Sequence, residues 1–552
     1  MGNSTKTIGN GSFAGCPLAS IDLPNTLFQI GELAFNGCYF TSIDLPNSLN
    51  TIGNYAFAAT NLESISIPSS ITTIQEGVFL QCQNLSSVYI PNSVTTIGSN
   101  AFCECSSLTT IDINSVTTVE MMAFMGCTSL TDFTFPNSVV SIGDGVFSYC
   151  TNLSSVYLGN SVSYIEGRLF HRCPNVQQII VAPDNPTYDS RDNCNALIRT
   201  SQNRLDVGCK ATVIPNTVTT IGSTAFFGCI QLDSIEIPNS VSEIQWEAFA
   251  ECSGLVYVDL PNSLVSIYGG AFDGCSSLTT IEIPKSVTSL GTNAFSRCNN
   301  LMSFTVPSAV TFMGNQIFDE CYNLAFVNIL NDNPPTLGQY SYDIDFPTSN
   351  ANFAIYVPYE SVDAYKMAPN WSTYANYIQL LAYKSIQGYG TGNDKWAFIA
   401  SPLVENTDPT TIDDMLPTTG TYDLYQFKPT GENGEWENYK VDSFNIINGQ
   451  GYLYANSGEV NVIFKGEFNE DETKEVSLLY NTSFAGWNLV GNPFPCYAYI
   501  DREYYMMNED GTAINPVAMP VSTPIPPCTG VFVKAETEGE TVVFRRVSGA
   551  QK

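Results

Sequence analysis

The sequence predicts a solenoid of stacked β coils with a parallel sheet along one face, followed by an all-β antiparallel domain resembling a sandwich. A motif, Ile-Gly-x-x-Ala-Phe-x-x-Cys-x-x-Leu-x-x-Ile-x-Ile-Pro-Asn-Ser-Val, recurs thirteen times at intervals of 22 or 23 residues, with one interval of 56. Self-similarity at this period is the signature of a leucine-rich-repeat solenoid. The period ends after residue 321, and from residue 384 short strand-like runs alternate with turn residues, which is typical of an antiparallel sandwich.

Each copy of the motif predicts one coil. Its Leu-x-x-Ile-x-Ile part, such as Leu85, Val88 and Ile90, alternates apolar and polar residues, as a half-buried strand does. The following proline, such as Pro91, ends the strand, and Asn-Ser supplies a turn. The Ile-Gly-x-x-Ala-Phe part then returns the chain. Stacking thirteen coils is expected to bury one apolar column and to form a parallel sheet on the concave face.

Twelve of the seventeen cysteines occupy one position, three residues after the repeat Phe, and Thr60 stands there in the remaining repeat. One thiol per coil at a single register predicts an inward ladder of free thiols that pack as small apolar side chains. Parallel side chains about 4.8 Å apart would strain a disulfide, and zinc needs clustered tetrahedral ligands. The only histidine, His171, is interpreted as a polar coil residue rather than a general base.

Residues 174–216 fill the long interval between two repeats. Two short runs, Asn195–Thr200 and Arg204–Val207, flank a Ser-Gln-Asn turn and predict a hairpin that projects from the solenoid. Cys194 and Cys209 flank the hairpin, so a disulfide between them is possible but not required.

The repeat "IPNSVTTIGSNAFCECSSLTTIDI" and the irregular unit "YDSRDNCNALI" followed by "GC" resemble the BspA-like leucine-rich-repeat surface proteins of Bacteroidetes type. The resemblance covers residues 5–383. It implies a solenoid at 1–321, a C-terminal cap at 322–383 that covers the last coil, and adhesion to host matrix proteins or to other bacteria. It names no ligand.

Residues 384–552 contain paired segments that predict an internal duplication, with halves at about 390–470 and 483–550. "WAFIASPL" matches "WNLVGNPF", "GQGYLYANSGE" matches "CTGVFVKAETE", and "VNVIFKG" matches "TVVFRRV". This part resembles C-terminal β modules of Bacteroidetes surface proteins. Cys496 and Cys528 lie in matched halves and are a possible second disulfide.

Composition excludes several classes of partner. The formal net charge is −32, from 53 acidic and 21 basic residues, so nucleic acid and anionic membranes are repelled. No stretch of 18 apolar residues exists, and no membrane insertion is predicted. The chain opens at "STKTIGNGSFAGC", the second half of a repeat, so we expect a trimmed N-terminus. We expect a secreted or cell-surface protein that is a monomer.

Strand positions between two apolar residues should face solvent and form a ligand-binding face. Glu236, Asp259 and Glu282 would stack like charges about 4.8 Å apart, which suggests either a weak Ca²⁺ site or a solvated polar face. Exposed tyrosines of this face could stack on sugar rings, or be ordinary scattered surface tyrosines. The predicted face comprises Asp22, Asp44, Tyr89, Asp112, Tyr157, Glu236, Tyr257, Asp259 and Glu282.

No motif in the sequence specifies a catalytic reaction or a cofactor. Paired carboxylates for glycoside hydrolysis are not distinguishable among 53 acids. We therefore predict a non-enzymatic recognition or adhesion protein that binds an extracellular protein through the repeat face, because large faces of repeat arrays are used for binding. Three alternatives stay open: a glycan-binding module, an enzyme with its active groups in the C-terminal domain, and a stalk that presents the C-terminal domain.

Overall fold

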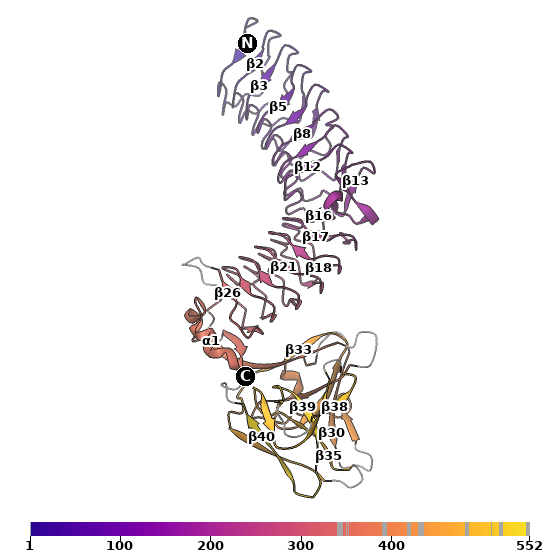
Figure 1. Ribbon diagram of the computed structural model, residues 1–552. Helices are drawn as coiled ribbons and strands as arrows, with labels where there is room; N and C mark the ends of the chain where they lie inside the picture. The colour runs from indigo at the N-terminus through magenta and orange to yellow at the C-terminus, as the bar shows by residue number, and fades with distance from the viewer. Residues whose placement is uncertain are drawn as a thin grey trace. The chain divides into compact units, whose positions relative to one another are not determined.

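A computed structural model describes residues 2–338, 346–348, 350, 353–388, 395–413, 415–416, 421–428, 435–480, 485–508, 511–517 and 523–547. The chain divides into two compact units. The first, here called the solenoid unit, comprises Met1–Phe326 and Pro335–Phe353. The second, the tail unit, comprises Val327–Pro334 and Ala354–Lys552. The predicted order of a repeat solenoid followed by antiparallel sheets is confirmed (Figure 1).

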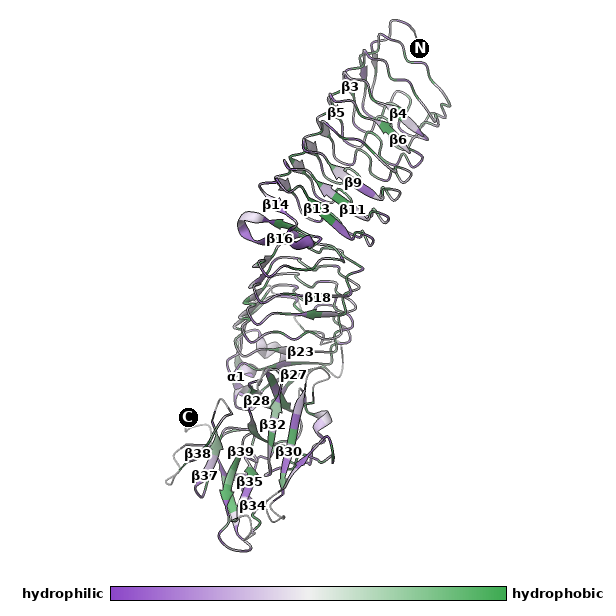
Figure 2. Ribbon diagram, turned by 90° about the vertical axis from the view of Figure 1, so that its right-hand side faces the viewer, coloured by the Kyte–Doolittle hydropathy of each residue, from purple (hydrophilic) through white to green (hydrophobic). Residues whose placement is uncertain are grey.

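The predicted strand of each repeat forms in several coils, and neighbouring copies pair in parallel with equivalent residues aligned. Val156 pairs with Phe133 in the preceding coil and with Ile179 in the next. Alternate residues of these strands point into the core, and the residues between them point outward; the outward residues are polar in most strands, and Ile180 in β13 is an exception. Figure 2 shows β9, β11 and β13 side by side. These face strands are β4 (Ser64–Ser66), β6 (Ser87–Tyr89), β9 (Asp132–Phe135), β11 (Ser155–Leu158), β13 (Gln178–Val181), β18 (Ser234–Glu236), β20 (Tyr257–Asp259) and β23 (Ser303–Val306).

A second parallel ladder, which the motif did not predict, runs through the two residues before the repeat glycine. In most coils the first is a half-buried hydroxyl residue and the second a fully buried aliphatic one, as in Thr96 and Ile97. These strands are β1 (Thr7–Ile8), β2 (Gln29–Ile30), β3 (Thr51–Ile52), β5 (Thr73–Ile74), β7 (Thr96–Ile97), β8 (Thr118–Val119), β10 (Ser141–Ile142), β12 (Tyr164–Ile165), β17 (Thr220–Ile221), β19 (Glu243–Ile244), β21 (Ser266–Ile267), β22 (Ser289–Leu290), β24 (Phe312–Met313) and β26 (Thr336–Leu337).

The Ala-Phe arc joins successive coils through backbone hydrogen bonds as well. Asn100 N donates to Met121 O at 3.0 Å, and Phe102 N donates to Ala123 O at 2.8 Å. The arc bends because two of its residues are left-handed, here Asn100 at φ 56° and Glu104 at φ 60°. Other coils place glycine at these two positions, which removes the steric cost of a left-handed residue.

Phenylalanine rings and thiols fill the interior of the coils. Phe102 and Phe124 lie nearly parallel with ring centroids 5.5 Å apart, and the same stacking recurs along the unit. The Cys127 thiol is fully buried and donates to the carbonyl oxygen of Phe102 in the preceding coil at 3.1 Å. Equivalent thiols make the same contact in most coils. The ladder cysteines therefore act as hydrogen-bond donors and not only as apolar filler.

The insertion forms the predicted hairpin, but the hairpin also takes part in the coil ladder. Its two strands pair antiparallel, and β16 then pairs in parallel with β17. The alternation that makes Leu205 buried lets β16 substitute for a missing coil strand. The arcs on either side stack directly, since Arg172 N donates to Gly228 O at 3.0 Å. The inserted elements are β14 (Tyr188–Asp189), η1 (Arg191–Asn193), β15 (Leu197–Arg199), η2 (Thr200–Gln202) and β16 (Arg204–Val207).

All seventeen cysteines are free thiols, including Cys194, Cys209, Cys496 and Cys528. Burial raises the pKa of Cys194 and of Cys496 to about 11. Those four thiols are buried and are not joined in pairs.

The tail unit begins with a short irregular segment. Strand β27 (Ala354–Pro358) is followed by η3 (Tyr359–Ser361), α1 (Val362–Met367) and η4 (Trp371–Tyr374). Tyr365 and Trp371 are fully buried against each other, with ring centroids 5.1 Å apart. The six-residue α1 is the one α-helix in the described parts of the chain.

The tail unit contains two four-stranded antiparallel sheets with the same strand order. The first is β29-β32-β30-β31 and the second is β35-β39-β37-β38. Each packs against a separate set of strands, β28 and β33 in one case and β34, β36 and β40 in the other. The strands are β28 (Ile378–Ile386), β29 (Ala397–Ala400), β30 (Tyr422–Lys428), β31 (Glu435–Asn438), β32 (Gly451–Asn456), β33 (Val460–Phe464), β34 (Thr473–Ser477), β35 (Trp487–Gly491), β36 (Ala498–Ile500), β37 (Tyr504–Met507), β38 (Ile514–Val517), β39 (Gly530–Lys534) and β40 (Thr541–Arg546); η5 spans Pro409–Thr411.

Contacts between the two sheets are reciprocal. Ala400 N donates to Cys528 O at 3.1 Å, and Gly491 N donates to Gly449 O at 2.9 Å. These residues occupy matching positions in the paired segments of the sequence, and Gly449 and Cys528 both have positive φ. An internal duplication of the sequence would produce such a reciprocal pair of hydrogen bonds between the two sheets. Residues 390–394, 483–484 and 548–550, at the edges of the predicted halves, lie outside the described residues.

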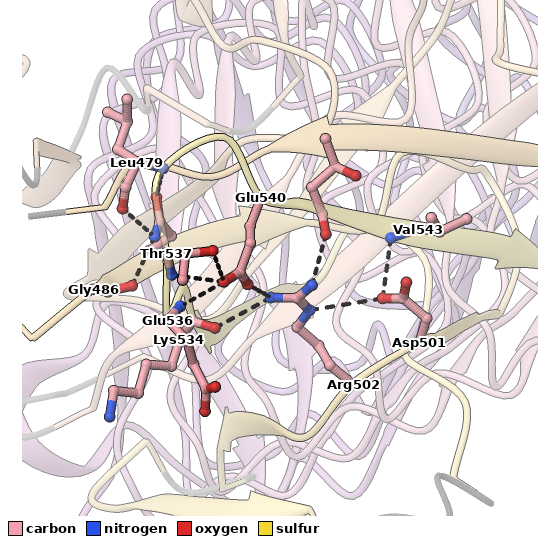
Figure 3. A network of polar contacts seen from close by, with 11 residues as sticks. Leu479, Gly486, Asp501, Arg502, Lys534, Glu536, Thr537, Glu540 and Val543 are labelled. Atoms are coloured by element: carbon pink, nitrogen blue, oxygen red, sulfur yellow. Dashed lines mark hydrogen bonds and ion pairs between the residues drawn. The ribbon is translucent and has the colours of Figure 1, made fainter.

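A polar network fixes the turn between β39 and β40. Figure 3 shows Arg502 reaching Asp501 and Glu540, while Glu536 and Thr537 approach the same Glu540. One oxygen of Glu540 accepts hydrogen bonds from the Thr537 hydroxyl at 2.8 Å and from Thr537 N at 2.6 Å. The hydrogen bond from the Thr537 hydroxyl, followed by those of Arg502 and the turn backbone, lowers the pKa of Glu540 to about 2.

Candidate functional site

The predicted ligand-binding positions lie on the outside of the solenoid unit. Five of the nine are in face strands, and the other four, Asp22, Asp44, Asp112 and Glu282, lie outside the assigned strands. We call this surface the repeat face. Tyr157 is half-buried, and the other eight predicted residues are exposed. The register aligns Tyr89 with Ser66 and Glu236 with Asp259 in the neighbouring coil. The repeat face therefore presents equivalent positions at a regular spacing.

Two of the predicted residues, Asp44 and Tyr89, line one hollow of the repeat face together with Ser66, and this hollow has a volume of about 580 Å³. Asp44, Ser66 and Tyr89 come from three successive coils. Tyr89 is 63% exposed, and no ring partner is found for it among the described residues. The other lining residues are serines, Asn47, Pro68 and Pro91, and the aliphatic residues Ile43, Leu45, Ile65 and Ile67. The hollow is thus mainly polar, with one large aromatic side chain among its lining residues.

The acidic positions in the second half of the solenoid unit do not form a metal cluster. Within the described ranges, no three Asp, Glu, His or Cys side chains are grouped so that they could hold a metal ion. Glu236 and Asp259 face solvent in register, and Glu282 lies in the next coil outside any assigned strand. The calcium hypothesis thus gains no support from the geometry.

His171 lies in the arc next to the insertion and outside the face strands. Its Nε2 is 3.2 Å from Glu251 Oε2, and its ring packs against Tyr149 and Phe227. Burial lowers the pKa of His171 despite the nearby Glu251 carboxylate. Arg172 also contacts Glu251, at 3.3 Å. These contacts join coils on the two sides of the insertion, which agrees with a structural role for the histidine.

The tail unit contains a second hollow surface, which we call the tail groove. It consists of two hollows of about 780 and 630 Å³ that share Lys384, Ser385, Pro526 and Thr529. The larger hollow is lined by Asp332, Pro358, Tyr359, Glu360, Leu381–Ser385, Pro495, Tyr497, Tyr499, Pro524, Pro526, Pro527, Thr529 and Val547. The smaller is lined by Lys384–Gln387, Lys395–Phe398, Met506–Asn508, Gly511, Pro526, Thr529 and Gly530.

The repeats decide the family of the chain. The family described as "BspA type Leucine rich repeat region (6 copies)" matches residues 6–128, 80–194 and 206–325, which together make up more than half of the chain. The chain belongs to the BspA-type leucine-rich-repeat family. None of the curated proteins compared with this BspA-type chain matches it.

Several solved structures resemble the BspA-type chain. A leucine-rich repeat protein from Bacteroides ovatus is 24% identical, with a TM-score of 0.43, over 62% of this chain and 83% of that one. A leucine rich cell surface protein from Faecalibacterium prausnitzii is 26% identical, with a TM-score of 0.39, over 59% and 83%. The pneumococcal vaccine antigen PcpA is 19% identical, with a TM-score of 0.41, over 68% and 82%.

Sequence reasoning on this BspA-type chain located the repeat face and missed the tail groove. The only signal for the groove was two runs rich in Pro and Tyr, "NPFPCYAYI" and "PIPPC". Those runs begin 108 and 140 residues after Lys384 in the sequence, so only the folded chain brings them to β28. In the described residues, no helix is long and apolar enough to cross a membrane.

Proposed function

We propose that this protein is a non-enzymatic recognition protein, secreted or held at a cell surface, that binds an extracellular protein ligand through the repeat face. The observation that carries the proposal is the hollow lined by Asp44, Ser66 and Tyr89. It lies on a surface whose geometry is fixed by coil stacking, so binding costs little conformational entropy. Membership of the BspA-type family supports a surface-recognition role.

The chemistry of the hollow suits adhesion to a polar protein surface. Tyr89 offers a large ring and a hydroxyl with few rotatable bonds, which is a combination enriched at binding hot spots. Asp44 adds a carboxylate that would pair with a basic side chain of a matrix protein. The strong negative charge of the whole chain favours the same basic ligands. The proposal needs no cofactor.

The test measures binding of the full chain to immobilised fibronectin, laminin and collagen by surface plasmon resonance. Tyr89→Ser should weaken binding at least tenfold, because a hot-spot aromatic contributes about 2 kcal/mol or more. Tyr322→Ser is the matched control, since Tyr322 is 61% exposed but lies outside the repeat face. Equal loss with both variants, or retention with Tyr89→Ser, would remove the hollow from the binding surface.

Two further assignments belong to the same proposal. The tail unit is assigned to the C-terminal β modules of Bacteroidetes surface proteins, with functional boundaries at 1–321, 322–383 and 384–552. If no matrix protein binds but simple polysaccharides do, the repeat face is a glycan-binding surface instead. If neither binds, the repeats serve as a stalk that presents the tail unit.

A further inference from the structure

Part of β28 has a strand partner on one edge only. Ala382–Ile386 pair antiparallel with β33, while β27 pairs only with the earlier residues Ile378–Leu381. Among the described residues, no other strand or backbone group is hydrogen-bonded to the main chain of Ala382–Ile386. One edge of this stretch therefore presents main-chain N–H and C=O groups that have no hydrogen-bonded partner in the described part of the chain.

The tail groove runs along this unpaired edge. Its lining includes seven consecutive residues, Leu381–Gln387, whose side chains alternate between the two faces of the strand. If the hollow lay over one face of the sheet, alternate residues of β28 would line it, together with residues of the neighbouring strand β33. No residue of β33 lines either hollow. The groove therefore lies beside the strand, on the edge opposite β33.

The wall across the groove does not complete the sheet. It contains Pro524, Pro526 and Pro527, and proline has no backbone N–H to donate. The Lys384 side chain reaches this wall, where Nζ donates to Thr529 Oγ1 at 2.7 Å. No carboxylate within the described ranges forms an ion pair with Lys384, and burial lowers its pKa to about 8. The Lys384 side chain thus connects β28 to the residues of the proline wall.

The two ends of the groove carry opposite charges. Asp332 and Glu360 line the end beside Leu381, and Lys395 lines the end beside Gln387. Tyr359, Tyr497 and Tyr499 add aromatic surface near the acidic end. Seven residues of β-strand span about 23 Å, so a segment filling the groove has room for one basic and one acidic side chain at its ends.

We propose that the tail groove binds an extended polypeptide segment of a partner protein, which adds to β28 at Ala382–Ile386 as a further β-strand. A basic side chain of the segment pairs with Asp332 and Glu360, and an acidic side chain pairs with Lys395. Main-chain hydrogen bonds supply affinity in this mode of recognition, and side-chain contacts at the ends supply specificity. This site is separate from the repeat face, so the protein has two binding surfaces.

The experiment uses the full chain and two fluorescein-labelled peptides, Lys-Thr-Val-Thr-Val-Thr-Glu and the charge-reversed Glu-Thr-Val-Thr-Val-Thr-Lys. Fluorescence anisotropy should detect one of them binding at least tenfold more tightly than the other, and the preferred order reports the strand direction. Two versions of the preferred peptide carry N-methyl groups on alternate amides. Because alternate amides of a strand face opposite edges, one version should lose binding and the other should retain it.

Protein variants test the charged end. Lys395→Glu should weaken the preferred peptide at least tenfold, and replacing the peptide's glutamate by lysine should restore binding. Lys474→Glu, outside the groove, is the control and should change little. The rescue compares two peptides on the same Lys395→Glu protein. A difference in folding between variants therefore cannot account for it.

Four results would overturn the proposal. The first is failure of both peptides to bind at 1 mM, and the second is equal binding of both N-methylated versions. The third is concentration-dependent dimerisation in sedimentation, lost on Lys395→Glu, which would assign the groove to a second copy of the chain. The fourth is binding of the protein to immobilised dextran or xylan that Tyr497→Ala abolishes and Tyr480→Ala leaves unchanged. This result would make the tail groove a glycan site.

Discussion

The thiol ladder leads to a prediction about stability. Whether threonine or valine is the more stable replacement for a ladder cysteine depends on whether a hydrogen-bond donor is needed there. Cys127 is fully buried, and its thiol donates to Phe102 O at 3.1 Å. Thr60 occupies the equivalent position of another coil, and its hydroxyl donates to Phe57 O at 2.8 Å. A threonine at position 127 would therefore find the carbonyl oxygen of Phe124 in its own coil. A valine there has the same shape and no donor.

The expected magnitudes follow from these contacts. Cys127→Ala removes one buried heavy atom, which costs about 1 kcal/mol, and one hydrogen bond, which adds about 1 kcal/mol. Cys127→Thr and Cys127→Val fill the site equally, so their packing terms cancel. If the donor matters, Thr should be more stable than Val by about 1 kcal/mol. If the thiol is only apolar filler, the Val variant should be the more stable, because burying a threonine hydroxyl that makes no compensating hydrogen bond lowers stability by about 1–3 kcal/mol.

The free energies of unfolding come from urea titrations followed by far-UV circular dichroism. Long repeat arrays do not always unfold in one step, so native-state hydrogen exchange should locate the change in the coils around position 127. Thr60→Cys is the control and should change stability by less than about 0.5 kcal/mol, since both residues donate to a carbonyl. A Val variant at least as stable as the Thr variant would refute a stabilising role for a hydrogen-bond donor at position 127.

Two further predictions concern a turn in the solenoid unit and the network of Figure 3. Ala59 is exposed at φ 55°, so Ala59→Gly should stabilise the protein by about 1 kcal/mol in urea unfolding, whereas Gly at the buried Ala58 should destabilise it. The pKa of Glu540 is lowered to about 2 by the Thr537 hydroxyl and its other donors. The stabilisation from this carboxylate is therefore present above its unfolded pKa of about 4.3 and is lost as the pH falls toward 2. Glu540→Gln should flatten the dependence of Tm on pH in this window, and an unchanged profile would contradict the assignment.

The sequence of the repeats predicted the solenoid because its information is local and periodic. Burial of Leu85 and Val88, the turn after Pro91 and the outward position of Tyr89 each follow from one short motif. Repetition multiplied this weak local signal thirteen times. The repeat face was predictable for the same reason, since alternation along a strand fixes which side chains leave the core.

Other features were decided only when distant parts of the chain met. The sequence placed a thiol in each coil, but its acceptor, a carbonyl 25 or 26 residues earlier, depends on how coils stack. The direct stacking of Arg172 on Gly228 likewise depends on how the inserted residues fold away from the arc. The tail groove needs β28, the proline run and the segment near Tyr497 together. The edge of β28 is open only because no other described segment pairs with it. The sequence of β28 alone does not contain that information.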